Sequence, residues 1–327
     1  MLSRRFKQEN VSEKMVIRPI RKKDFDQLFE LVSKSFRKEI QITGLSVQRL
    51  SRLAKLYRLF EMLLPVFDLF HKDFDTILVA VSGGRLIGGI HLVPRGKKMW
   101  SLYSAAVDTM FRGHGVFRKL MKEALEYISK RHGERVFGSV RTDKIPVVKT
   151  FKKLKFEAFG KEILLQLELN KVPVVEFNES MLIREAKPAD VGEVYQICKA
   201  LSPKKTQVYK IAPGDFLDSF FSRMVNRMAW SYSKRWVMEI NGRIVGYAQV
   251  TYTPPQKAGE ILSFYVIPKS STLISFLLSE VLRFLATRNV RKLTTSLDEE
   301  WRETMQVFER FGFKRIATVH EMAKDLI

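Results

Sequence analysis

The chain contains one succession of elements twice, and this repeat constrains its fold more than any other feature of the sequence. Residues 15–36 and 181–201 each begin with a short alternating strand pattern that carries an Ile-Arg pair. A charged turn with Asp24 or Asp190 follows in each segment, and an amphipathic helix pattern comes next. One such match could arise by chance, whereas a run of matches in the same order indicates a true repeat.

The later segments of the two halves also match in order. Each half contains two strands joined by a Gly-containing turn, as in a β-hairpin, and then a third strand that runs into a helix. A short strand, a helix and a final strand close each half. The matching pairs are 76–93 with 235–252 for the hairpin, 99–107 with 260–267 for the third strand, and 115–131 with 271–288 for the helix. We therefore predict two copies of one α+β unit, with domains at 1–172 and 173–327.

Composition excludes several classes of protein. A hydrophobic content of 46% is ample for packed cores, so the chain is not wholly disordered. The one cysteine, Cys198, excludes a disulfide framework, and the five histidines show no metal-ligand spacing, so we expect no metal. The sequence has no run of about 18 apolar residues that would predict a membrane span. Its N-terminus lacks the apolar core of a signal peptide, so we expect a cytoplasmic protein.

The positive charge is concentrated in the first half of the chain. The chain has 57 Lys and Arg against 35 Asp and Glu, a formal charge of +22. Residues 1–175 hold 35 of the basic and 18 of the acidic residues, and so carry +17 of this charge. Such a charge indicates an anionic partner, although a Lys-rich solvated surface would give the same count. Nucleic acid stays possible, but no helix-turn-helix, RNA-recognition or zinc motif accompanies the basic clusters.

A phosphate-binding loop is predicted between the third strand and the helix of the first half. The segment Arg112-Gly113-His114-Gly115 stands at this junction. Small residues there let successive backbone N–H groups point into one concavity, with the positive end of the helix dipole behind them, which suits a pyrophosphate. A Gly-x-Gly before a helix is by itself a weak signal, and the loop matches neither a Walker loop nor a Rossmann fingerprint.

The strand, the segment VDTMFRGHGV (107–116) and the following helix resemble the acetyl-CoA-binding motif of the GNAT N-acyltransferase superfamily, Arg/Gln-x-x-Gly-x-Gly/Ala. The order of elements in both halves also resembles the GNAT fold, so the likeness covers nearly the whole chain, twice. It implies an α+β protein of two tandem GNAT-like domains, each a mixed, mostly antiparallel sheet flanked by helices. It further implies acetyl-CoA or another acyl-CoA as cosubstrate and an amine as acceptor.

The resemblance also implies which residues bind the acyl-CoA. In the family, the strand parts from its neighbour to hold the pantetheine arm, and the backbone amides of the loop bind the pyrophosphate. The corresponding residues here are Ala105 and Val107 on the strand and Arg112, Gly113, His114, Gly115, Val116 and Phe117 in the loop. Phe117 departs from the motif, which has Gly or Ala at that position. In the second half Lys269-Ser270-Ser271-Thr272 replaces the loop, so we predict a degenerate copy that shapes the acceptor site of the first.

The resemblance supplies no obvious catalytic acid or base. A tyrosine four positions before a Gly-Phe pair often serves as the acid in the family, but Phe151 and Phe308 stand at that position here. The third strand also lacks the glutamate that some members use as a base. Tyr103, Ser104 and His91 are the polar candidates near it. We take Tyr103 as the catalytic candidate, with an ordinary packed strand tyrosine as the alternative.

Residues 46–70 predict an amphipathic helix with a broad apolar face and several arginines. This region covers the acceptor site in the family, so a bulky or apolar acceptor is one interpretation. The alternatives are an ordinary core-facing helix and a basic amphipathic helix that rests on an anionic membrane surface.

Three functions are consistent with these features. We predict an N-acyltransferase that moves an acetyl or other acyl group from acyl-CoA to an amine. A Fem-like transferase that uses aminoacyl-tRNA also has two GNAT-like domains, and the charge favours it, but the retained loop argues against it. A non-catalytic acyl-CoA sensor or interaction module is favoured by Phe117, by Phe151 and by the missing carboxylate.

Overall fold

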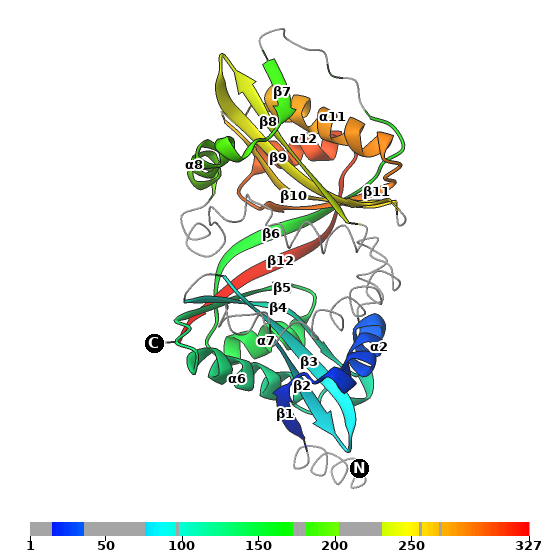
Figure 1. The fold of residues 1–327 in the computed structure, drawn as a ribbon, viewed down its shortest axis with the longest axis vertical. Helices are drawn as coiled ribbons and strands as arrows, with labels where there is room; N and C mark the ends of the chain where they lie inside the picture. The colour runs from blue at the N-terminus through cyan, green and yellow to red at the C-terminus, as the bar shows by residue number, and fades with distance from the viewer. Residues whose placement is uncertain are drawn as a thin grey trace. The chain divides into compact units, whose positions relative to one another are not determined.

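The computed structural model describes residues 15–35, 76–95, 98–172, 175, 181–202, 231–254, 257–267 and 270–326. The chain divides into two compact units (Figure 1). Unit 1 consists of Met1–Ile40, Ser46–Ala158 and Glu321–Ile327, and unit 2 consists of Gln41–Leu45 and Phe159–His320. Residues 46–70, for which we predict an amphipathic helix, lie outside the described residues.

Unit 1 has a mixed sheet with the strand order β1-β2-β3-β4-β5-β12. Neighbouring strands from β1 to β4 are antiparallel, whereas β4 and β5 are parallel. Its strands are β1 (Val16–Pro19), β2 (Thr76–Ser82), β3 (Arg85–Pro94), β4 (Met99–Val107), β5 (Arg135–Arg141) and the end of β12 (Lys314–Asp325), and its helices are α2 (Phe25–Ser35), α6 (Val116–Ser129) and α7 (Ile145–Lys153).

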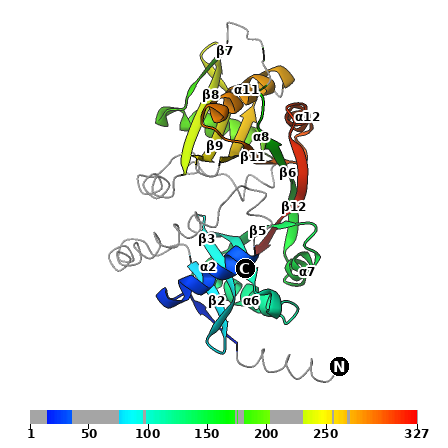
Figure 2. The same cartoon turned by 90° about the vertical axis from the view of Figure 1, so that its right-hand side faces the viewer.

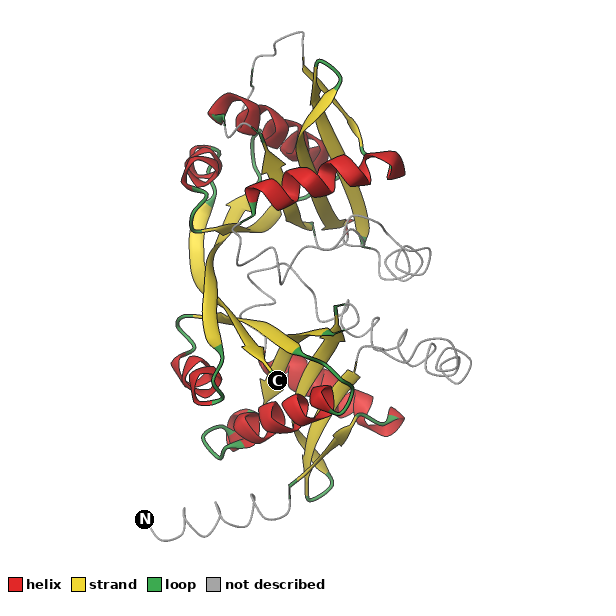
Figure 3. Ribbon diagram, turned by 90° about the vertical axis from the view of Figure 1, so that its left-hand side faces the viewer, coloured by secondary structure: helices red, strands yellow, loops and turns green. Residues whose placement is uncertain are grey.

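Two adjacent glycines in β3 let helices approach both faces of this sheet (Figure 3). A Cβ at Gly88 would lie 3.0 Å from Leu120 of α6, and a Cβ at Gly89 would lie 3.1 Å from Leu28 of α2. Successive residues of a strand point to opposite faces, so α6 and α2 cover different faces. The core under α6 is the larger one, and a smaller cluster lies under α2.

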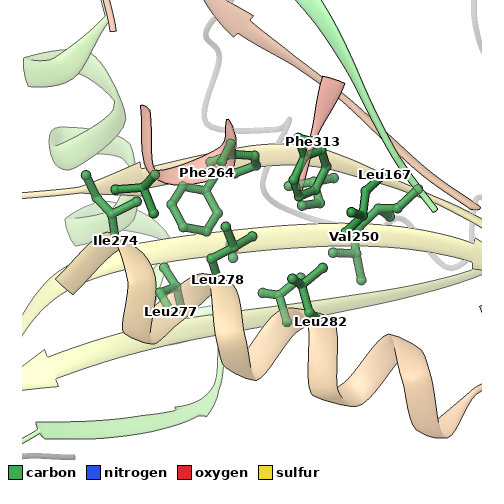
Figure 4. Packing of buried hydrophobic residues seen from close by; sticks show 14 of the residues in the cluster. Leu167, Val250, Phe264, Ile274, Leu277, Leu278, Leu282 and Phe313 are labelled. Carbon is green, nitrogen blue, oxygen red and sulfur yellow. The ribbon is translucent and has the colours of Figure 1, made fainter. Parts of the chain in front are cut away.

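Unit 2 repeats this architecture with the strand order β12-β6-β11-β10-β9-β8-β7. Its core lies between the sheet and α11, where Leu277, Leu278 and Leu282 pack against strand residues (Figure 4). Its strands are β6 (Glu157–Glu168), β7 (Met181–Glu185), β8 (Tyr232–Ile240), β9 (Arg243–Thr253), β10 (Ala258–Val266) and β11 (Lys292–Asp298), and its helices are α8 (Val191–Leu201), α11 (Ser271–Thr287) and α12 (Arg302–Arg310). The predicted α+β class, with two tandem units of mixed sheet and flanking helices, is confirmed.

The last strand of each half is exchanged between the units. β6 follows α7 in the sequence, yet it pairs with β11 of unit 2, from Glu168↔Lys292 to Glu162↔Asp298. The end of β12, the last strand of the chain, joins β5 in unit 1. β6 and β12 are neighbours in the sheet (Figure 2). The compact units therefore do not divide the chain between residues 172 and 173, because each half supplies a strand to the other unit.

The Ile-Arg pair and the aspartate of each repeat form one ion pair per unit. Arg18 donates two hydrogen bonds to Asp24, the shorter at 2.5 Å, and Arg184 donates two to Asp190, the shorter at 2.7 Å. Asp24 also accepts a hydrogen bond from the backbone of Arg21, which closes the turn before α2. In both units the arginine therefore fixes the strand to the start of the helix, which explains the repeated pattern structurally.

We expect Asp24→Asn to lower the unfolding free energy of unit 1 by about 2–3 kcal/mol at pH 7, because it leaves the guanidinium of Arg18 without its charged partner. Asp24 is 4% exposed, and the hydrogen bonds from Arg18 hold the pKa of its carboxyl below the ordinary value. A lowered carboxyl pKa stabilises the fold above the unfolded pKa of about 4, and this contribution is lost as the pH falls below it.

Denaturant unfolding of wild type and variant between pH 7 and pH 2 measures both effects. The difference in unfolding free energy should shrink as the pH falls. The control is Glu30→Gln, which removes the exposed ion pair with Lys34 and should change stability by less than about 0.5 kcal/mol. A difference that stays constant down to pH 2 would contradict the role of the carboxylate.

Candidate functional site

β4 and β5 part in the middle of unit 1. Their parallel pairing runs from Met99↔Arg135 to Leu102↔Gly138 and stops there. β4 continues beyond this point and stays paired with β3 as far as Val107↔Gly88. From Tyr103 onward, the strands that the structure describes pair with β4 on the β3 side only.

The exposed edge of β4 carries peptide groups at Ala105 and Val107. The backbone N–H of Asp108 donates to Ile87 on β3 at 2.9 Å, so alternation directs the peptide groups of Ala106 to β3 as well. Those of Ala105 and Val107 then face the opposite side, where Arg112 Nε donates to the Val107 carbonyl at 3.2 Å. An extended ligand with amide groups can hydrogen-bond along such an edge, much as an added strand would.

A β-bulge displaces Tyr103 at the point where the strands part. The register changes from Leu92↔Leu102 to His91↔Ser104, which leaves Tyr103 as the extra residue. Its side chain is 68% exposed, and its ring meets that of His91 edge-on at 5.5 Å between centroids. The three polar residues predicted near β4 are thus brought together at the bulge. Because its side chain is exposed, Tyr103 is not an ordinary packed strand tyrosine, which was the alternative interpretation from the sequence.

The loop after β4 is held open by two glycines. Asp108 accepts a hydrogen bond from Met110 at 2.9 Å and pairs with Arg85, which fixes the turn that precedes the loop. Gly113 and Gly115 have φ of 83° and 77°, a left-handed region that other residues adopt at a cost of about 1–2 kcal/mol. A Cβ at either glycine would meet no heavy atom within 4 Å, so the loop backbone is open on that side.

The loop ends at the start of α6. Gly115 is the N-cap of the helix and makes no side-chain capping bond. The first N–H groups of a helix have no partner within it, and the helix dipole is positive there, so this end suits an anion. Arg112 and Arg118 are exposed at the two ends of the loop and can add charge.

The side chains of the other loop residues point elsewhere. Val116 is buried against β3 and Phe117 packs on Phe151, with 6.4 Å between ring centroids. His114 is half-buried. Val116 and Phe117 can therefore bind a ligand through their backbone N–H groups. The ring of Phe117 packs against the core and does not occupy the loop.

Phe151, at the predicted tyrosine position, is buried among aromatic rings. It contacts Phe117 and meets Phe156 edge-on at 4.8 Å. It can offer no proton to a reaction. Lys155 follows with φ 62°, where the second half has Gly312 with φ 94°. Both residues end a helix in the left-handed conformation, but only glycine adopts it without strain.

Lys155→Gly is expected to raise the unfolding free energy of unit 1 by about 1 kcal/mol, because it relieves a left-handed lysine at the end of α7. Thermal unfolding measures the change. The matched opposite variant is Gly312→Lys, which should lower the unfolding free energy of unit 2 by a similar amount. An equal loss of stability in both variants would contradict this reading of the two turns.

One carboxylate of unit 1, that of Glu321, could not be predicted as a site residue from the sequence. Glu321 lies on β12 in the second half of the sequence, yet it hydrogen-bonds to Ser139 of β5 at 3.0 Å. The alternating strand pattern around it placed it in the wrong unit, because the exchange of strands leaves no mark on the pattern.

Unit 2 has the same strand geometry without the other features. β10 and β11 pair from Ala258↔Lys292 to Ile261↔Thr295 and then part, and Leu262 is the bulged residue. At the position of Ala105 stands Phe264, which is buried against Phe308 with 5.1 Å between ring centroids. Ser270 is the N-cap of α11 in an extended conformation, with φ −113°. The ring of Phe264 thus packs on α12 where unit 1 has the small side chain of Ala105, and the sequence has no glycine at the start of the helix.

The described residues also bear on metal sites and on membrane-spanning segments. No group of three or more His, Cys, Asp or Glu in this part of the chain could hold a metal ion. None of the helices among the described residues combines the length and the hydropathy needed to cross a membrane.

The chain is similar to known proteins in sequence family and in fold. The acetyltransferase (GNAT) family matches residues 27–156, and an acetyltransferase (GNAT) domain matches residues 183–326. The fold is similar to that of the GCN5-related N-acetyltransferase from Sphaerobacter thermophilus, with a TM-score of 0.67 and 16% identity over 96% of each chain. It is also similar to a tandem GNAT protein from the clavulanic acid biosynthesis pathway, with a TM-score of 0.67 and 14% identity over 96% of this chain and 99% of that one.

No curated protein matches the sequence. At identities this low, the solved structures show the common fold alone, whereas the two family matches cover both halves of the chain. The predicted tandem arrangement is therefore confirmed. The chain belongs to the GNAT acetyltransferase family and contains two GNAT domains.

Proposed function

We propose that unit 1 binds an acyl-CoA and transfers its acyl group to an amine. The observation that carries the proposal is the coincidence of two features in unit 1. Beyond Leu102 no strand among the described residues pairs with the edge of β4 that faces β5, and the loop that follows has two left-handed glycines at the start of α6. The GNAT family generally uses acyl-CoA as cosubstrate and amine-bearing acceptors.

The roles of the residues follow from their geometry. The peptide groups of Ala105 and Val107 would hold the amide-bearing pantetheine arm along β4. The N–H groups of the loop would bind the pyrophosphate, with Arg112 and Arg118 as additional positive charges. The residues that would provide N–H groups are Gly113, His114, Gly115, Val116 and Phe117.

The acyl-CoA supplies a thioester, and unit 1 would position an amine for direct attack on it. Such a reaction needs a neutral amine, a polarised carbonyl and a proton for the departing thiolate. Tyr103 stands at the bulge, beside Leu102, the last residue of β4 that pairs with β5, and its phenol group is exposed. We assign it the donation of that proton.

Tyr103→Phe is expected to lower kcat by about 10–100-fold with little change in KM for acetyl-CoA, because it removes the hydroxyl and keeps the ring against His91. Steady-state release of CoA measures both constants. The control is Tyr127→Phe, which removes the hydroxyl that contacts Thr76 away from the bulge. Equal kcat values for the wild type and Tyr103→Phe would contradict the assignment.

Unit 2 would have a structural role. Where unit 1 has Ala105, unit 2 has Phe264, whose ring packs on α12, and the start of α11 lacks glycines, so we assign no acyl-CoA to this unit. The acceptor is an amine, with a bulky or apolar body as our expectation from residues 46–70.

The test is the release of CoA from acetyl-CoA when the full chain meets a panel of amines that includes polyamines, peptides and aminoglycosides. Acetylated product with stoichiometric CoA is the expected result. Binding of acetyl-CoA without release would favour the sensor. Salt-dependent retention of tRNA, without acetyl-CoA binding, would favour a Fem-like transferase.

A further inference from the structure

A carboxylate is buried in unit 1 close to the point where β4 and β5 part. Glu321 of β12 is 2% exposed, and its Oε2 accepts a hydrogen bond from Ser139 Oγ at 3.0 Å. Ser139 comes directly after Gly138, the last residue of β5 that pairs with β4. The serine side chain is exposed. Its hydroxyl therefore connects a buried carboxylate with the surface of unit 1 beside the parted strands.

Ser139 shares a face of the sheet with the polar residues of β4. A Cβ at Gly138 would lie 3.4 Å from the α7 ring at Phe151, so alternation directs Ser139 to the opposite face. That face is the one that α2 covers, as the contact of Gly89 with this helix shows. His91 is two residues after Gly89 and pairs with Ser104, so both residues lie on this face as well.

A carboxylate at this position is not needed to hold β12 in place. A glutamine could accept the same hydrogen bond from Ser139, and burial of a carboxylate costs more free energy than burial of an amide. Lys324 of β12 donates to the Leu154 carbonyl, and the N–H of Leu326, which follows β12, donates to the Glu134 carbonyl, each at 2.8 Å. The attachment of β12 to unit 1 therefore does not depend on the bond between Glu321 and Ser139 alone.

Unit 2 contains an equivalent pair of a serine and a glutamate, but the burial of the glutamate and its surroundings differ. Ser296, the fifth residue of β11 as Ser139 is of β5, donates a hydrogen bond to Glu162 of β6. Glu162 is only half-buried, and Phe264, whose ring packs on α12, stands where unit 1 has Ala105. Both units thus receive a glutamate on an exchanged strand, but only in unit 1 is it buried next to the exposed edge of the central strand.

We propose that Glu321, acting through the hydroxyl of Ser139, accepts the proton that an acceptor ammonium must lose before it can attack. The inference rests on the proposed function. The ammonium gives a proton to Ser139 Oγ as the hydroxyl proton passes to Glu321. The amine lone pair forms the C–N bond, and the C–S bond breaks. The thiolate takes the phenol proton of Tyr103, and the second nitrogen proton restores that phenol. CoA leaves as the thiol, and Glu321 returns its proton to water.

The test compares Glu321→Gln with wild type on two amines of similar size. Benzylamine is an ammonium ion at neutral pH, whereas aniline is already neutral and needs no proton acceptor. The variant should lose at least about 100-fold in kcat/KM with benzylamine and less than about threefold with aniline. Its melting temperature should equal or exceed that of the wild type. Ser139→Ala should show the same selectivity, with a loss of about tenfold.

The control is Glu162→Gln, which makes the same change in the pair of unit 2 and should leave both rates within about twofold of wild type. Equal losses with both amines, or no loss with benzylamine, would overturn the role of Glu321. If Glu321→Gln had a lower melting temperature than the wild type and lost activity equally with both amines, the role of the Ser139–Glu321 pair would be structural. A wild-type chain that binds no acetyl-CoA and acetylates neither these nor other amines would refute the proposed function, and the inference with it.

Discussion

A chain that ends at Phe313 is expected to lose the folded state of unit 1, although every residue removed belongs to the second half of the sequence. The deletion removes β12, the neighbour of β5. It takes away Met322, which is 1% exposed in the core under α6, and the ion pair of Asp325 with Arg135 at 2.6 Å. Loss of a buried methionine alone costs about 2–5 kcal/mol, a large part of the stability of a small domain.

Hydrogen exchange measures this effect unit by unit. Amides of β2 to β5 should lose protection in the truncated chain. Amides of β8 to β11 should keep most of theirs, because no residue of β12 belongs to the core under α11. The graded variant Met322→Ala, in the full chain, should weaken protection in unit 1 by about 2–4 kcal/mol and leave unit 2 unchanged. Loss of protection confined to unit 2 would contradict the exchange of strands.

Gly115→Glu is expected to weaken acetyl-CoA binding by at least about 100-fold, or roughly 2.7 kcal/mol. The substitution places a side chain and a negative charge on the open side of the loop, where a Cβ meets no protein atom. It also strains a residue with φ 77° by about 1–2 kcal/mol. The repulsion and the altered backbone act on the same anion site at the start of α6, so stabilisation of the protein by acetyl-CoA should disappear.

The matched control for this variant is Gly242→Glu. Gly242 lies in the β8–β9 turn with φ 74°, and a Cβ there also meets nothing within 4 Å. The same strain is thus introduced in unit 2, away from the loop. Isothermal titration of both variants with acetyl-CoA should show normal affinity for Gly242→Glu. Unaltered affinity in Gly115→Glu would exclude the loop as the pyrophosphate site.

Much of the fold could be predicted because the repeat is local. Alternating and helical patterns identify the strands and helices, and their order in both halves identifies the α+β units. The ion pairs of Arg18 with Asp24 and Arg184 with Asp190 lie within those segments, and both residue types stand out in the repeat. The exchange of β6 and β12 could not be predicted, because a strand pattern is the same whichever sheet the strand joins.

The same distinction applies to the site. The loop at 112–117 is continuous in sequence, and its glycines predict the left-handed backbone conformation that they adopt. Ser139 and Glu321 are 182 residues apart and meet only because β12 joins unit 1. The resemblance to the family implies a glutamate on β4 as a possible base, and β4 has none. In the alternating pattern of this strand Glu321 stands between Val319 and Ala323, and a charged residue at such a position is the signal that could have drawn attention to it.

The central claim is that one of two similar units binds acyl-CoA. Isothermal titration of the full chain with acetyl-CoA tests it most directly, because it gives the number of sites as well as the affinity. The account predicts one site per chain, retained in Gly242→Glu and lost in Gly115→Glu. Two sites per chain would contradict the structural role proposed for unit 2, and the absence of any binding would contradict the proposed function.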